Sequence, residues 1–131
     1  MAEGVLVVET DRGLDETGET LTRAIVDRKF GVIAVQDLEA IMAKKEVVLG
    51  RGCRVYEVCN PHQAKRVMDS DMSISSALPC RISIYEEDGK TKMATILPSL
   101  LLSAFDQHGL AEVADEVETV MVESMREAAS A

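Results

Sequence analysis

The sequence predicts an α+β fold, in which helices pack on one mixed β-sheet to give a compact single domain of two layers, residues 1–131. Short runs rich in β-branched residues alternate with segments of helical periodicity. Near the C-terminal side, an Asp88-Gly89 turn joins two alternating runs into a hairpin. The predicted element order is β-α-β-α-β-α-β-β-α-α, and no internal repeat or linker interrupts it.

The first two strands frame an amphipathic helix. Residues 5–10 predict a strand, and residues 15–28 predict a helix, with Asp15 as its N-cap. Gly18 weakens this helix by about 1 kcal/mol relative to alanine. Residues 30–35 predict the second strand, which is apolar on both faces, so we expect it to be central and covered on each side by helices and by a second subunit.

The next two helices each begin at a side chain that suits a helix cap. Asp37 is expected to cap a short helix that ends near Lys44-Lys45, where cations suit the negative end of the helix dipole. Residues 53–59 predict the third strand. Asn60 is expected to cap the following helix, with Pro61 at its first position, so almost no loop separates strand from helix.

The C-terminal part predicts two helices after the hairpin. Pro98 starts a leucine-rich helix, and residues 109–128 form a longer one with a continuous apolar stripe. His108, in the polar joint between them, is expected to be solvated or to cap a helix. Because the segment 100–102 is apolar around more than one face, we expect a homodimer.

Composition excludes several classes of function. A formal net charge of −9 argues against nucleic-acid binding, which needs cations to neutralise phosphates. The same negative charge argues against binding to an anionic membrane surface, which would repel it. No apolar run approaches the roughly 20 residues that a membrane-spanning helix needs. Three cysteines without a secretion signal favour reduced thiols in the cytoplasm.

The sharpest candidate site combines Cys59, Cys80 and His62. Helix amides beyond Asn60 are expected to favour a Cys59 thiolate, His62 can supply a base or a ligand, and Cys80 at the start of a neighbouring strand can bring its sulfur close. The alternative is that both cysteines are small buried core residues. No CxxC motif is present, and about 20 Å of extended strand separates Cys53 from Cys59, so we predict no closed structural zinc site and assign no metal-ligating residues.

Five cations can form a locally basic anion site, although scattered solvated charges are the commoner explanation: Arg51, Arg54, Lys65, Arg66 and Arg81.

The chain resembles the DUF302 family, a small domain of unknown function. The resemblance rests on Cys59-Asn60-Pro61, Leu78-Pro79-Cys80 and the acidic hairpin 85–89, and covers about residues 5–104. It implies a compact homodimer and no established activity. The cysteines place the chain with a branch that has both thiols, and the helix 109–128 lies beyond the family-like core.

Three hypotheses follow. The first is a cytoplasmic homodimeric binding or accessory module that captures a small anion, a thiol compound or a metal ion without turnover, with Cys59, Asn60, His62 and Cys80 as binding residues and no cofactor. The alternative is a thiol redox or sulfur-handling protein, with Cys59 as nucleophile, Cys80 as resolving thiol and His62 as a modulator of the thiolate charge. The third is a purely structural interaction protein, and whether the chain is an enzyme stays open.

Overall fold

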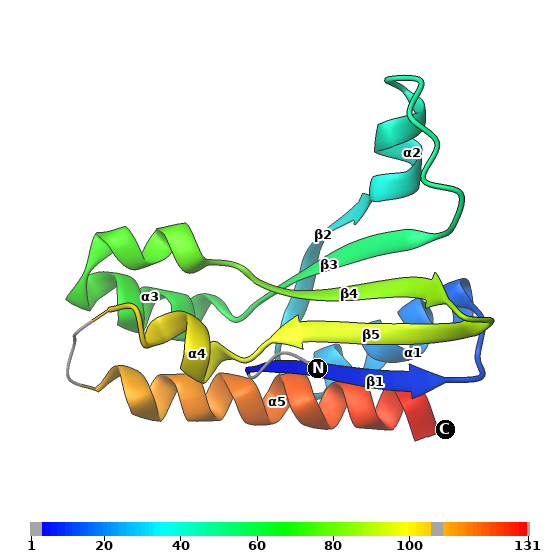
Figure 1. The fold of residues 1–131 in the computed structure, drawn as a ribbon. Coiled ribbons are helices and arrows are strands. Elements are labelled where there is room, and N and C mark those ends of the chain that lie inside the picture. The colour runs from blue at the N-terminus through cyan, green and yellow to red at the C-terminus, as the bar shows by residue number, and fades with distance from the viewer. Residues whose placement is uncertain (1–3, 106–108, 131) are drawn as a thin grey trace.

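The computed structural model describes residues 4–105 and 109–130 (Figure 1). Its elements in chain order are β1 (Val5–Thr10), α1 (Leu14–Asp27), β2 (Gly31–Asp37), α2 (Leu38–Ala43), β3 (Cys53–Cys59), α3 (Pro61–Ser70), the 3-10 helix η1 (Met72–Ala77), β4 (Cys80–Glu87), β5 (Lys90–Ile96), α4 (Pro98–Leu102) and α5 (Leu110–Ser130). The predicted order is confirmed, with η1 as an addition. His108, for which a solvated or capping role was predicted, lies outside the described residues.

The five strands form one sheet in the order β1-β5-β4-β3-β2, and every neighbouring pair is antiparallel. The α+β class is confirmed, although the sheet is antiparallel throughout rather than mixed. The prediction of a central second strand was wrong, because β2 is an edge strand. Ile33 and Val35 of β2 are 60% and 46% exposed, whereas Phe30 and Val32 are partly buried against the core.

Helices α1 and α5 contact each other and pack on one face of the sheet, which gives the two layers. Residues that alternate along the central strands, such as Ile82, Ile84 and Met93, point into this layer and have no exposed surface. Between them lie Ser83 and Ala94, which point to the opposite face and stay partly exposed. The period-two alternation of the sequence therefore selects the core face of the sheet.

The start of α1 differs from the prediction. Gly13 occupies the N-cap without a side-chain hydrogen bond, so the assignment of Asp15 as N-cap was wrong. Asp15 lies in the first turn and pairs with Arg54 of β3. Gly18 has a packing reason, because a Cβ there would lie 2.0 Å from Tyr56 Oη.

Between β2 and β3 the chain leaves the body of the molecule as a projection, and we call residues 38–52 the arm (Figure 1). Asp37 caps α2 as predicted, since its Oδ1 accepts a hydrogen bond from Ala40 N–H at 3.0 Å. The helix closes where Val47 N–H donates to the carbonyl of Met42 at 3.0 Å, with Glu46 at φ 61°. No residue of α2 is buried.

The hairpin of β4 and β5 is confirmed. Its turn residues Asp88 and Gly89 have φ of 56° and 74°, and two successive positive φ values are typical of the tight turn that suits twisted antiparallel strands. None of the described helices has the length and apolar character needed to cross a membrane.

Candidate functional site

The junction between β3 and α3 has the predicted geometry. The Asn60 Oδ1 atom accepts hydrogen bonds from the backbone N–H groups of His62 (2.9 Å) and Gln63 (3.2 Å), and Pro61 is the first helical residue. The Asn60 Nδ2 group donates to the carbonyl of Lys29 at 3.0 Å. One amide side chain therefore caps α3 and also ties it to the chain just before β2.

The start of β4 lies beside this junction. Cys80 is paired with Val58 in the β3–β4 register, so it is next to the residue that precedes Cys59. The segment before it contains Leu78 and Pro79, joined by a cis peptide bond. The register thus brings together the two segments that the sequence singled out.

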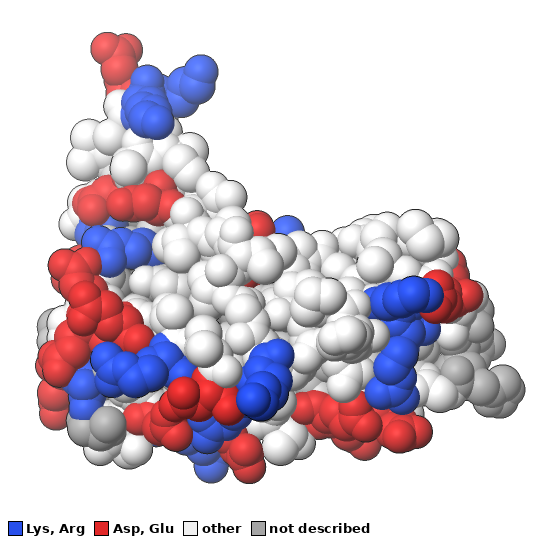
Figure 2. Space-filling model, turned by 180° about the vertical axis from the view of Figure 1, so that it is seen from behind, with Lys and Arg blue, Asp and Glu red and all other residues white. Residues whose placement is uncertain are grey.

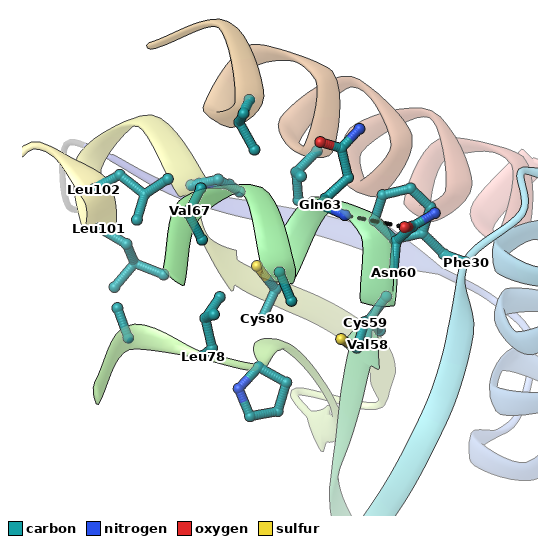
Figure 3. A pocket seen from close by; sticks show the side chains of 16 residues that line it. Phe30, Val58, Cys59, Asn60, Gln63, Val67, Leu78, Cys80, Leu101 and Leu102 are labelled. Carbon is teal, nitrogen blue, oxygen red and sulfur yellow. Dashed lines mark hydrogen bonds between the residues drawn. The ribbon is translucent and has the colours of Figure 1, made fainter. Parts of the chain in front are cut away.

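A pocket with a cavity volume of about 40 Å³ lies where these two segments meet helices α3, α4 and α5, and we call it the junction pocket. Figure 3 shows Asn60 and Gln63 at one end, Leu101 and Leu102 at the other, and Cys80 between them. None of the lining residues is charged: Phe30, Val58, Cys59, Asn60, Gln63, Ala64, Val67, Ala77, Leu78, Pro79, Cys80, Pro98, Leu101, Leu102, Val113 and Val117.

Three of the four predicted binding residues line this pocket. Cys59, Asn60 and Cys80 do so, whereas His62 does not. The side chain of His62 is exposed on the first turn of α3, where its backbone N–H is the group that meets the Asn60 cap. The imidazole of His62 is therefore not part of the pocket lining.

The thiols differ from the expectation of an activated cysteine. Burial raises the pKa of Cys59 above its ordinary value, which reverses the expected lowering by the helix amides. Burial, and then the nearby Cys59 sulfur, raise the pKa of Cys80 to about 11. All three cysteines are free thiols. Both pocket thiols are consequently protonated at neutral pH.

A metal site needs more ligands than the pocket offers. Among residues 4–105 and 109–130, no group of three or more His, Cys, Asp or Glu side chains is placed to hold an ion. The junction pocket contributes only two sulfurs to such a set, and its other lining residues carry amides or hydrocarbon.

Most cations of the predicted anion site form ion pairs with nearby carboxylates. Arg54 pairs with Asp15 across the α1–β3 contact, and three other cations pair as follows: Lys65 with Asp69, Arg66 with Glu116, and Arg81 with Glu57. Each of these cations has a carboxylate within 4.0 Å, and none lines the junction pocket. These four positions therefore form local pairs rather than one anion site, and the fifth predicted cation, Arg51, does not line the junction pocket either.

Sequence reasoning missed the far wall of the pocket. Leu101 and Leu102 come from α4, and Val113 and Val117 come from α5. The apolar stripe of the last helix was visible in the sequence, but its contact with the Cys59 junction depends on how α5 crosses the body. No signal in the sequence links these distant segments.

The fold and the pocket define a class of protein: a small α+β domain with an antiparallel sheet, helices on one face and a small uncharged pocket at a strand-to-helix junction. A family model described as "Domain of unknown function DUF302" matches residues 6–128. The chain belongs to this family, which confirms the resemblance. The match also includes α5, which the sequence resemblance had placed beyond the family-like core.

A solved structure supports the same conclusion. The chain is similar to an uncharacterized conserved protein, DUF302, from Bacillus stearothermophilus, with 26% sequence identity and a TM-score of 0.91. The similarity covers 97% of this chain and 99% of the other. No match was found among curated proteins.

Proposed function

We propose that this DUF302 protein is a non-catalytic binding module that takes an uncharged aliphatic group of a small organic molecule, such as a short-chain thiol, into the junction pocket. The observation that carries the proposal is the convergence of the Cys59-Asn60 junction and the segment 78–80 on a pocket without a charged lining residue. Sites for small molecules are mostly apolar, with a few fixed polar groups that set orientation.

The size of the cavity limits the ligand. A water-sized group needs at least about 10–15 Å³ of such volume, so about 40 Å³ holds roughly three such groups. This corresponds to a chain of about three carbon atoms. A larger ligand has to leave most of its atoms outside the pocket.

The polar groups of the pocket fit an uncharged ligand. Asn60 Oδ1 is used by the α3 cap, and Gln63 Nε2 donates to Glu116 at 2.7 Å, so both amides are held in place. The thiols of Cys59 and Cys80 have raised pKa values and offer weak S–H donors rather than negative charge. Such a site favours a weakly polar group, for example a thiol or a thioether.

The other hypotheses receive less support. An anion would enter an uncharged apolar pocket at a large desolvation cost, and a metal ion would meet two protonated thiols. A redox role needs a reactive thiolate, whereas burial raises the pKa of Cys59. A reducing compartment such as the cytoplasm suits three free thiols and is part of this proposal.

The test is a titration with 1-propanethiol and with 1-propanol, followed by amide chemical shifts in nuclear magnetic resonance. Binding is expected to move the resonances of Gln63 and Cys80 and to raise the melting temperature, because a ligand of the folded state stabilises it. Inorganic phosphate and Zn²⁺ serve as probes for the anion and metal hypotheses.

A matched pair of variants locates the site. Ala64→Leu adds a larger side chain at the pocket wall and is expected to abolish the shifts, while Ala111→Leu makes the same change at an exposed position of α5 outside the pocket. If propanethiol and propanol leave the pocket amides unmoved at saturation, or if Ala64→Leu responds like Ala111→Leu, the proposal is refuted.

A further inference from the structure

A second hollow lies between α1 and β3, away from the junction pocket, and we call it the α1 groove. Its volume is about 630 Å³, within the range of about 300–1,000 Å³ that is typical of small-molecule sites. The lining residues of α1 recur every three or four positions from Asp15 to Val26, so they share one face of the helix, and β3 contributes Arg54 and Tyr56. The groove and the junction pocket have no lining residue in common.

Tyr56 lines the α1 groove with a hydroxyl that lacks an acceptor. Tyr56 is 7% exposed, and its hydroxyl reaches α1 at Gly18, where an added Cβ would lie 2.0 Å from Oη. The polar group beside the hydroxyl is the Arg54 guanidinium, which can donate to the oxygen but cannot accept its proton. Among residues 4–105 and 109–130, no group accepts a hydrogen bond from Tyr56 Oη. Because buried hydroxyls normally have partners, this donor indicates a ligand that carries an acceptor.

The charged residues of the groove balance in sign. Arg54 is paired with Asp15, whereas Arg23 and Glu19 line the groove with exposed side chains. In the described part of the chain, neither Arg23 nor Glu19 has an oppositely charged group within 4.0 Å. Figure 2 shows acidic and basic side chains intermixed along the margins of the body rather than gathered by sign. An ion of one charge would meet a like charge in the groove, whereas a zwitterion can pair with both Arg23 and Glu19.

The spacing of the two unpaired charges limits the class of zwitterion. Glu19 and Arg23 are four positions apart on α1, so about 5–6 Å separates their Cβ atoms. The two charged groups of a ligand that meets both residues therefore lie close together, as they do in a free amino acid. Val26, which is 55% exposed, follows on the same helix face and offers an apolar contact for an aliphatic side chain.

We propose that the α1 groove is a second ligand site, which binds a free aliphatic amino acid. The ligand carboxylate accepts the hydrogen bond of the Tyr56 hydroxyl and faces Arg23. The ligand ammonium group faces Glu19, and the aliphatic side chain lies on Val26. The two sites take different ligands, because the α1 groove is lined by charges of both signs and the junction pocket by none.

Amide chemical shifts in a titration with L-leucine test the proposal. L-Leucine is expected to move the resonances of Gly18, Glu19 and Arg23 and to leave those of Gln63 and Cys80 in place, because the last two line the junction pocket. N-Acetyl-L-leucine lacks the ammonium charge and L-leucinamide lacks the carboxylate, so each is expected to bind at least about tenfold more weakly. The proposal is overturned if L-leucine moves no groove resonance, if it moves only those of the junction pocket, or if the three compounds bind equally.

A matched pair of tyrosine variants tests the hydroxyl. Tyr56→Phe keeps the ring and removes the unpaired donor, so it is expected to weaken L-leucine binding about tenfold. Tyr85→Phe makes the same change on β4 outside the groove, and is expected to leave the affinity within about twofold of the wild type. Equal affinities of the two variants for L-leucine would show that the Tyr56 hydroxyl does not contact the ligand, which overturns the assigned site.

Two charge variants test the assigned roles of Glu19 and Arg23, whose exposed side chains are not needed for folding. Glu19→Gln is expected to remove most of the preference for L-leucine over N-acetyl-L-leucine, and Arg23→Gln most of the preference over L-leucinamide. Arg126→Gln, at an exposed position of α5, is the control and is expected to keep both preferences. If Glu19→Gln and Arg23→Gln also keep both preferences, the proposal is wrong.

Discussion

Replacing Gly18 with alanine is expected to destabilise this protein, although the same change in the interior of an exposed helix stabilises it by about 1 kcal/mol. The difference lies in the packing of α1 on β3. A Cβ at position 18 would lie 2.0 Å from Tyr56 Oη and 2.9 Å from its Cζ, whereas ordinary contacts begin at 3.4 Å. Tyr56 is only 7% exposed, so its ring cannot easily move away.

The magnitude follows from two opposing terms. Overpacking of a well-filled core lowers the free energy of unfolding by about 1–3 kcal/mol, and the better helix propensity of alanine raises it by about 1 kcal/mol. We therefore expect Gly18→Ala to lower the free energy of unfolding by about 1 kcal/mol, and by up to about 2 kcal/mol if the ring is held firmly. Urea unfolding followed by circular dichroism measures this difference.

A double-mutant cycle with Tyr56→Phe checks the cause. Removing the hydroxyl eliminates the 2.0 Å contact and leaves the 2.9 Å contact, so Gly18→Ala is expected to cost at least about 1 kcal/mol less in the Tyr56→Phe background. A Gly18→Ala variant that is more stable than the wild type would refute the reasoning, because propensity would then outweigh packing.

Three further predictions concern the junction. Asn60→Ala removes the cap of α3 and the hydrogen bond to the Lys29 carbonyl, so it is expected to lower the free energy of unfolding by about 2 kcal/mol. Asn60→Ser keeps a capping oxygen and is expected to lower it by about half as much. Equal losses for the two variants in urea unfolding would contradict this prediction. Burial and the neighbouring Cys59 raise the pKa of Cys80 from 9.0 to about 11, so the folded state prefers the protonated thiol and its stabilising contribution is lost as the pH rises from 9.0 towards 11. Between about pH 8 and pH 11, the free energy of unfolding of the wild type is expected to fall by at most about 3 kcal/mol more than that of Cys80→Val. Identical pH profiles of the two proteins in urea unfolding would exclude the raised pKa of Cys80. In a Cys53→Ser, Cys80→Ser chain, Cys59 is expected to react with iodoacetamide at neutral pH more slowly than a free model thiol, because its pKa is raised. Alkylation faster than that of the model thiol would restore the redox hypothesis.

The sequence by itself determined the elements and several local contacts. Alternation defined β4 and β5, Asp88-Gly89 defined their turn, and Asn60-Pro61 defined the start of α3. These features depend on neighbours within a few residues, so local patterns suffice to predict them. The same holds for the Asp37 cap, which acts on a backbone N–H three residues away.

Only the tertiary structure decided the position of each strand, the charge state of the thiols and the walls of the pocket. An apolar strand has the same sequence pattern whether it is central or at an edge, and β2 proved to be at the edge. The pKa of Cys59 depends on burial by distant segments, which outweighs the helix amides that sequence spacing suggested. Likewise, Val113 and Val117 reach the junction pocket only because α5 packs across the body, a long-range contact that no local pattern specifies.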